Sequence, residues 1–149
     1  MTIAHGKIAS WREADRLRAL LAYDVLDTPR EKDFDDIAAL AAAVCETPIA
    51  VVNLIGDQRQ FFKAEVGLGV RETPIDSSFC VKAILEDDFL LVPDATADKR
   101  FDCNPLVTGA PELRFYAGAL LKTADNFPIS VPIGKLSAVF SCASMPARC

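Results

Sequence analysis

The cysteines and the single histidine are the side chains that could support nucleophilic or metal-binding chemistry. The cysteines are Cys45, Cys80, Cys103, Cys142 and Cys149. Their number is odd and no pair has Cys-x-x-C spacing, which predicts reduced thiols rather than a disulfide framework or a zinc site. His5 stands in a terminal segment without an apolar pattern, so neither a Cys–His pair nor a Ser-His-Asp triad is predicted.

Cys80 is the cysteine best placed for reactivity. It follows Ser77–Phe79 at the start of a predicted short helix, where backbone N–H groups lower the pKa of a thiol. The alternative is a buried, unreactive thiol packed against the preceding phenylalanine. Cys45 falls on the apolar face of a predicted helix, where we expect a small core residue. Cys103 lies in a predicted exposed loop beside Asp102, whose negative charge disfavours a thiolate.

Charged residues between positions 92 and 121 form a second group of candidates. Asp94 and Asp98 are typical of turns in which a carboxylate accepts from a nearby backbone amide. Arg100 and Arg114 carry forked donors. These either lock the segment onto carboxylates and carbonyls or hold an anionic ligand.

Aromatic residues in the same stretch, and two glycines earlier in the chain, have structural interpretations as well as functional ones. Phe101, Phe115 and Tyr116 are core or loop anchors, or alternatively stack on a ligand. Gly67-Leu68-Gly69 lacks the third glycine and the following helix of a dinucleotide-binding fingerprint, so it predicts a turn.

Length and composition indicate the kind of chain that must position these residues. The chain has 149 residues, 51% of them hydrophobic, with a formal net charge of −5, which predicts one folded domain rather than a disordered chain. No apolar run reaches the ~20 residues of a transmembrane helix, and the first residues lack the apolar core of a signal peptide. The negative charge argues against a nucleic-acid partner. We therefore expect a cytoplasmic protein without membrane insertion.

Two amphipathic helices are predicted first. Ala14–Leu26 carries Leu17, Leu20 and Leu21 on a narrow apolar stripe, which suits packing on a neighbouring element or on a second copy of the chain. Thr28–Glu31 has the pattern of a capping box and predicts a helix that ends before Pro48. The apolar face expected on this second helix comprises Phe34, Ile37, Ala38, Ala41, Val44 and Cys45.

The remainder of the chain predicts mostly strands. Residues 49–55 and 60–64 form a hairpin in this interpretation, followed by a loop over 65–78 and a short helix from Ser77 or Ser78. Further strands are expected at 89–92, at 113–121 and within 129–140, with a long loop over 94–111. This order predicts an α+β fold with an antiparallel sheet and helices packed on one face.

Several separated motifs together resemble a GAF domain. They are residues 19–34, residues 49–55, Gln60-Phe-Phe-Lys63, Asp76-Ser-Ser-Phe-Cys80 and the stretch 93–121. More narrowly, the chain is similar to the N-terminal GAF domains of bacterial sensor histidine kinases and cyclic-di-GMP turnover proteins. The resemblance implies a profilin-like central antiparallel sheet of about six strands, with helices on one face and a small-molecule pocket on the other. It places the domain at 13–140, after a flexible N-terminus at 1–12 and before an irregular tail at 141–149, with the family's exit helix and effector domain missing.

The resemblance also implies a function. The domain would be a non-enzymatic sensory module that binds a small molecule, forms a homodimer and controls an output kinase or cyclase domain in its parent protein. Two alternatives remain: a free-standing cysteine reductase of the free methionine sulfoxide reductase type, and a dimerisation module without a ligand. The pocket is expected between the sheet and the loop Glu65–Pro111. Its expected lining is Phe62, Phe79, Cys80, Asp94, Phe101, Arg114 and Tyr116.

This interpretation does not identify a cofactor. The motifs with which family members attach bilins or bind cyclic nucleotides are missing from this sequence. Bilin-binding relatives carry Cys-His, whereas this chain has Cys80-Val81 and Cys103-Asn104. Lys82 stands where relatives commonly carry a histidine. The signature of cyclic-nucleotide-binding members is absent as well. The resemblance therefore predicts a pocket without covalent bilin and leaves its ligand unidentified.

Overall fold

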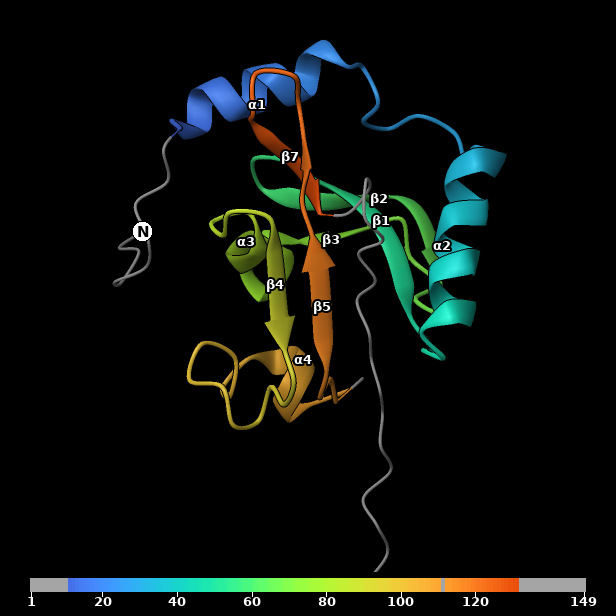
Figure 1. The fold of residues 1–149 in the computed structure, drawn as a ribbon, viewed down its shortest axis with the longest axis vertical. Coiled ribbons are helices and arrows are strands. Elements are labelled where there is room, and N and C mark those ends of the chain that lie inside the picture. Colours follow the sequence, from blue (N-terminus) through green and yellow to red (C-terminus); the bar gives the residue numbers. More distant parts are fainter. Residues whose placement is uncertain (1–10, 111, 132–149) are drawn as a thin grey trace, which may run out of the picture.

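The computed structural model describes residues 11–110 and 112–131, and the expectations for His5, Cys142, Cys149 and the tail lie outside these ranges. The helices are α1 (Glu13–Ala22), α2 (Lys32–Val44), α3 (Cys80–Ala83) and α4 (Pro105–Thr108), with a 3₁₀ turn η1 (Ile75–Ser77). The strands are β1 (Ala50–Ile55), β2 (Arg59–Val66), β3 (Glu72–Pro74), β4 (Phe89–Val92), β5 (Tyr116–Ala119), β6 (Leu121–Lys122) and β7 (Pro128–Val131). Figure 1 shows their arrangement.

The predicted α+β class is confirmed, and the strands divide into two antiparallel sheets. Five strands follow the order β3-β2-β1-β7-β6, while β4 pairs with β5. The expected single sheet of about six strands therefore differs from the observed one. The strand predicted over 113–121 is divided at Leu120, whose N–H donates to Asp88 O at 2.8 Å in the register of β4 and β5, whereas the next residues, β6, pair with β7 in the other sheet.

Both faces of β1 are covered, which explains its uninterrupted apolar sequence. Every residue of the strand is buried. Val52 packs with Ala38 of α2, and Leu54 packs with Leu20 of α1, so these two helices cover one face. On the other face Ile55 joins a larger core that includes residues of α3, β4, β5 and α4. The helices α1 and α2 thus leave the opposite face of the sheet to the site.

The first helix is shorter than predicted. It ends at Ala22, with Tyr23 as C-cap, whereas the apolar spacing favoured a helix as far as Leu26. Asp24 adopts φ 50°, in the left-handed region that stops an α-helix. The prediction was wrong because the apolar spacing continues past the end of the helix. Such spacing carries no information on the backbone conformation of the turn that follows.

The capping box predicted at Thr28 was also wrong. The second helix begins at Lys32, with Glu31 as its N-cap and no side-chain cap hydrogen bond. The Thr28 hydroxyl instead donates to Val25 O at 2.7 Å and accepts from Lys63 Nζ at 2.7 Å. A tertiary contact with β2 therefore takes the side chain that local sequence had assigned to the helix start.

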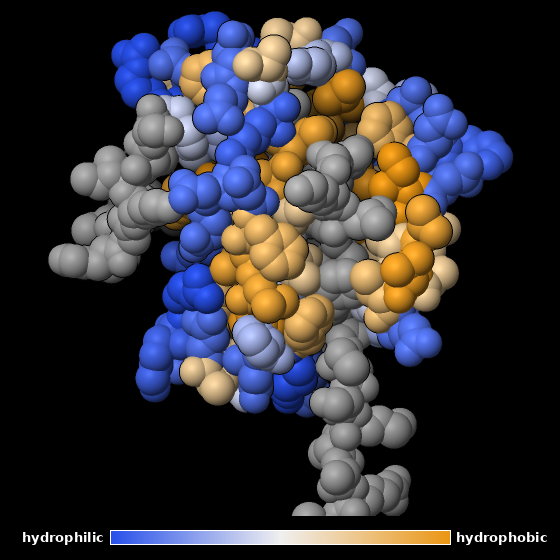
Figure 2. Space-filling model, in the orientation of Figure 1, coloured by the Kyte–Doolittle hydropathy of each residue, from blue (hydrophilic) through white to orange (hydrophobic). Residues whose placement is uncertain are grey.

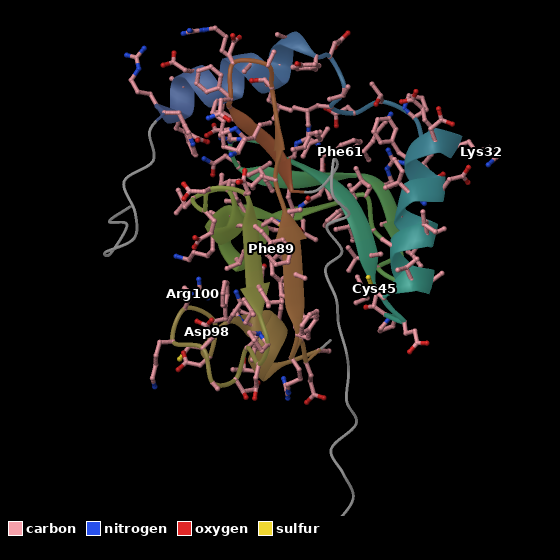
Figure 3. The ribbon with its side chains drawn as sticks, in the orientation of Figure 1. Lys32, Cys45, Phe61, Phe89, Asp98 and Arg100 are labelled. Carbon is pink, nitrogen blue, oxygen red and sulfur yellow. The ribbon has the colours of Figure 1, made fainter. Side chains whose placement is uncertain are left out.

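The buried side of α2 is narrower than the predicted apolar face. Ala38 and Ala41 are buried, whereas the Val44 residue is 66% exposed. The helix ends at Val44, and Cys45, expected in the core, is exposed at that end (Figure 3). The packed side of α2 ends near Ala41, and Cys45 is the C-cap beyond the last helical residue, so it does not reach the sheet.

The predicted β1–β2 hairpin and the turn after it are confirmed. The two strands pair antiparallel from Ala50–Val66 to Ile55–Gln60. Gly67 and Gly69 both have positive φ, at 75° and 74°. The Glu65 carboxylate accepts from the backbone N–H groups of Leu68 and Gly69, each at 2.9 Å. Glycine and a side-chain acceptor therefore fix the loop that leads from β2 toward β3.

Exposed apolar side chains gather in two places in the view of Figure 2. Phe89 and Leu91 project from the outer face of β4, and Leu40 and Val44 from α2. Among the residues that the structure describes, no helix has the length and apolarity needed to cross a membrane.

Candidate functional site

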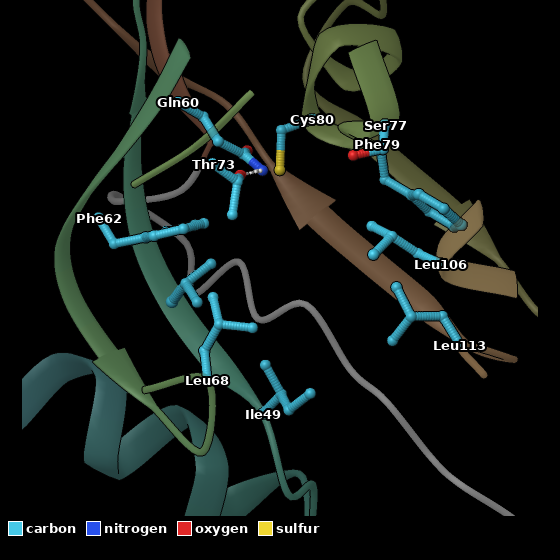
Figure 4. A pocket seen from close by; sticks show the side chains of 11 residues that line it. Ile49, Gln60, Phe62, Leu68, Thr73, Ser77, Phe79, Cys80, Leu106 and Leu113 are labelled. Carbon is cyan, nitrogen blue, oxygen red and sulfur yellow. Dashed lines mark hydrogen bonds between the residues drawn. The ribbon is translucent and has the colours of Figure 1, made fainter. Parts of the chain in front are cut away.

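A largely apolar cavity of about 90 Å³ lies on the face of the sheet opposite α1 and α2. Figure 4 shows its lining. The lining residues are Ile49, Val51, Gln60, Phe62, Leu68, Thr73, Ser77, Phe79, Cys80, Leu106 and Leu113. This is the place between the sheet and the segment 65–111 where a pocket was expected.

Two walls of different origin enclose this cavity. One wall is the cluster of Ile49, Val51 and Phe62 from the β1–β2 hairpin, with Leu68 from the glycine turn packed against it. The opposite wall comes from η1, α3 and α4, where Phe79 belongs to the larger core. Alternation along β2 explains the first wall, since Phe62 faces the cavity while Phe61 packs with Leu20 of α1 on the other face.

Three of the expected site residues, Phe62, Phe79 and Cys80, line this cavity. Phe101 and Tyr116 lie behind it. The Phe79 ring stacks on Phe101, with centroids 4.2 Å apart, and is tilted against Tyr116 at 5.3 Å. Both supporting rings are buried, so in this structure they hold the position of Phe79 in the wall.

Asp94 and Arg114 stand apart from the cavity lining. The Asp94 carboxylate accepts from Thr96 N at 3.0 Å and from Thr96 Oγ1 at 2.6 Å, and these bonds lower its pKa. Arg114 donates to Val107 O and Leu113 O at 3.0 and 3.1 Å. Both side chains lock the long loop onto itself, which was one of the two uses predicted for this group.

Arg100 is engaged in the same way. Its guanidinium contacts the Asp98 carboxylate at 3.0 and 2.7 Å and lies 3.6 Å from Glu86 (Figure 3). The hydrogen bond from Arg100 lowers the pKa of Asp98. Ion pairs with Asp98 of the loop and with Glu86 before β4 therefore occupy this guanidinium.

Cys80 is a buried thiol in the cavity wall. Tyr116 Oη donates to Cys80 Sγ at 3.3 Å, and the Cys80 N–H donates to Ser78 Oγ at 3.1 Å. Burial raises the pKa of Cys80, and it raises the pKa of Tyr116 well above its ordinary value. The neutral thiol is thus the stable form, in agreement with the buried alternative and against a reactive thiolate. Cys103 is exposed, as predicted.

A polar corner of the cavity was not found from the sequence. Gln60 Nε2 donates to Thr73 Oγ1 at 2.8 Å, and both residues line the cavity (Figure 4). Gln60 is two residues before Phe62 on the same strand, so the period of two would have placed it on the same face. The partner Thr73 belongs to a three-residue strand within the segment predicted as a loop.

The chemistry of the lining is that of a binding site rather than an acid–base site. Among the described residues, the lining comprises aliphatic and aromatic side chains together with hydroxyl, amide and thiol groups, and includes no carboxylate, lysine, arginine or histidine. Across the described ranges no group of three or more His, Cys, Asp and Glu side chains is arranged to hold a metal ion.

Comparison with known proteins gives one sequence relative of high similarity. The chain is 46% identical over 102 residues to a cyclic di-GMP phosphodiesterase of Pseudomonas aeruginosa. The match covers 68% of this chain but only 17% of the relative, so the chain spans a small part of that protein. No family model matches the sequence.

Solved structures of low sequence identity share the fold. The GAF domain of a phosphoenolpyruvate-protein phosphotransferase from Acinetobacter has a TM-score of 0.55 at 15% identity, over 86% of this chain and 76% of that one. The free methionine-R-sulfoxide reductase of Neisseria meningitidis has a TM-score of 0.56 at 14% identity, over 92% and 81%. Identities this low inform on architecture and leave activity open. The chain therefore has the GAF fold.

Proposed function

We propose that this domain is a sensory module of a bacterial signal-transduction protein, and that the cavity beside Phe62, Phe79 and Cys80 binds a small molecule. The observation that carries the proposal is the largely apolar cavity on the face of the sheet that α1 and α2 leave free. Small-molecule sites are concave and mostly apolar, with a few polar groups that orient the ligand. The module acts in the cytoplasm.

The output that this sensor controls is inferred from the sequence relative. A sequence identity of 46% over 102 residues to part of a cyclic di-GMP phosphodiesterase supports a parent protein that turns over cyclic di-GMP in preference to a histidine kinase. The cavity, at about 90 Å³, is well below the ~300–1,000 Å³ of typical ligand pockets. It therefore suits a small effector rather than the cyclic dinucleotide itself.

A cysteine reductase is the alternative function that the fold permits. The nucleophile in such an enzyme is a thiolate, and burial raises the pKa of Cys80, the cysteine in the cavity wall. This weighs against the reductase. Turnover of free methionine sulfoxide with a thiol reductant measures the alternative directly, and turnover lost in Cys80→Ala would establish it.

Xenon is a suitable probe for whether the cavity admits a ligand, because it enters small apolar cavities without hydrogen bonding. We expect pressurised xenon to shift the methyl NMR signals of Ile49 and Leu106 in the full chain. Leu68→Phe, which fills the cavity from its half-buried rim, should abolish the shifts. Leu21→Phe is the control, since the Leu21 residue is 65% exposed on α1. Unshifted cavity methyl groups in the wild type would contradict the proposal.

A further inference from the structure

The amide of Gln60 is oriented by its neighbours. Its Oε1 accepts from Asn53 Nδ2 and from Ser78 Oγ, each at 2.8 Å. Two donors from two different elements therefore fix the carbonyl end of the amide, and its Nε2 end is directed at Thr73 Oγ1, 2.8 Å away. With Asn53 Nδ2 as the donor, a flip of the Gln60 amide alone would place its Nε2 protons against that donor, so the two amides share one joint orientation.

This orientation leaves donors, rather than acceptors, at the polar corner. Thr73 Oγ1 accepts from Gln60, and within the described part of the chain its own proton has no acceptor. Gln60 Nε2 carries a second proton beyond the one given to Thr73. Both residues line the cavity. A ligand that offers a lone pair here would satisfy the Thr73 hydroxyl and the remaining Gln60 N–H.

The remaining lining residues determine the size and polarity of the rest of that ligand. Its walls are dominated by aliphatic and aromatic side chains such as Val51, Leu68 and Leu113, and none of the described residues that line it is charged. A charged molecule would lose its hydration without gaining a counter-charge, which is costly. The cavity is smaller than the ~150 Å³ apolar void that binds benzene, so the ligand is short.

From this arrangement we infer that the cavity takes a small neutral molecule with an apolar body and one hydrogen-bond acceptor, such as a carbonyl or ether oxygen. Thr73 and Gln60 donate to that acceptor, while the apolar walls contact the body. Thr73 and Gln60 are then the residues that determine specificity. The inference rests on the proposed function, because it describes the ligand of the same cavity.

A matched set of probes tests it on the full chain. Butanone and 2-methyl-1-butene have the same shape, and only butanone presents an oxygen acceptor, whereas butyrate adds a charge. We correct each affinity for the free energy of transferring the probe out of water. After this correction, we expect NMR titrations to show tighter binding of butanone than of the alkene. We expect no binding of butyrate in the cavity. Butyrate binding as tight as that of butanone would overturn the inference.

Thr73→Val removes the hydroxyl at nearly constant shape, and Thr108→Val is the control at an exposed position outside the cavity. We expect Thr73→Val to weaken butanone about fivefold, as for one lost hydrogen bond, and to leave the alkene unchanged. The unchanged alkene also shows that the variant is folded. Equal effects on both probes would overturn the inference and leave the proposed function standing. If neither probe binds and xenon does not enter, both fail.

Discussion

Arg16 and Lys63 are charged side chains with almost no solvent exposure, and each is surrounded by acceptors. Arg16 donates to both Glu13 carboxylate oxygens at 2.6 and 2.7 Å and to Ile55 O at 2.8 Å, which ties α1 to the end of β1. Lys63 forms an ion pair with Glu31 and donates to Thr28 Oγ1 and Pro29 O at 2.7 and 2.8 Å. Buried charges persist only when they are paired in this way. They fix the α1–α2 connection on the face of the sheet opposite the cavity.

Thr28→Val tests the contact that replaced the predicted capping box. The change removes one of the acceptors of Lys63 and the donor to Val25 O, so we expect about 1–3 kcal/mol of destabilisation in urea unfolding. Thr28→Ser keeps the hydroxyl and should remain close to the wild type. Equal stability of Thr28→Val and Thr28→Ser would contradict the role of the hydroxyl.

Cys80 should be the least reactive of the described thiols. Its burial raises its pKa, whereas Cys45 and Cys103 are exposed. In single-cysteine variants, we expect iodoacetamide to label Cys45 and Cys103 readily at pH 8, and Cys80 only at the rate of opening of the fold. Rapid labelling of Cys80 below neutral pH would contradict the buried, protonated thiol.

The raised pKa of Cys80 also gives stability a pH dependence of known sign. The unfolded thiol ionises near its ordinary pKa of about 8.5, before the buried thiol does. The contribution of the raised Cys80 pKa to the free energy of unfolding is therefore fully present below that pH, and it is lost as the pH rises above it. We expect the unfolding free energy of the wild type to fall more steeply than that of Cys80→Ala between neutral and alkaline pH. Parallel curves would contradict the shift.

At the scale of elements, the turn between β2 and β3 decides where the wall of the cavity lies. Gly67 approaches the chain before β1 so closely that a Cβ atom placed on it would lie 1.9 Å from Pro48 O. Glu65 holds the following amides, and Leu68 enters the cavity lining. Burial tends to raise the pKa of Glu65, but the N–H groups of Gly69 and Leu68 and the charge of Arg30 hold it below its ordinary value.

Gly67→Ala and Gly69→Ala separate crowding from backbone strain. Both glycines have positive φ, which costs an L-residue about 1–2 kcal/mol. At Gly69 nothing lies within 4 Å of the added Cβ atom, so that variant should lose only this amount. Gly67→Ala must also move the Pro48 backbone and should lose distinctly more in chemical unfolding. Equal losses would show that the close approach to Pro48 does not constrain the loop.

At the scale of the whole molecule, α1 is the element whose apolar stripe the fold covers only in part. Leu20 is fully buried against Leu54 and Phe61, whereas the Leu21 residue is 65% exposed. Leu17 and Leu21 also border a surface groove beside Gly56–Arg59. We propose that this surface forms the homodimer contact through which the sensor acts.

Leu21→Glu tests the dimer without disturbing the buried Leu20. Placing a charge in an apolar interface should convert a dimer to a monomer in light scattering of the full chain. Leu40→Glu is the matched control, because the Leu40 residue is similarly exposed, at 54%, on α2. The proposal fails if wild type and Leu21→Glu have the same mass, or if Leu40→Glu dissociates the dimer equally.

Features that depend on local periodicity could be predicted from the sequence. The β1–β2 hairpin, the strand Phe89–Val92 and the glycine turn at 67–69 are predictable because alternation, β-branched residues and glycine act over a few neighbours. The α+β class follows from the order of such elements. Phe62, Phe79 and Cys80 could be placed near one cavity because they adjoin these elements in the resemblance to GAF domains.

Contacts between side chains that are distant in the sequence depend on the folded arrangement of the elements. Thr28 had the local signature of a helix cap, yet the buried ammonium of Lys63, thirty-five residues away, takes its hydroxyl. Thr73 joined the cavity because β3 pairs with β2 and brings it beside Gln60. Cys45 is exposed because α2 ends at Val44 and leaves Cys45 as the C-cap. Long-range hydrogen bonds and packing compete with local preference at such positions, and a sequence pattern carries no record of the distant partner.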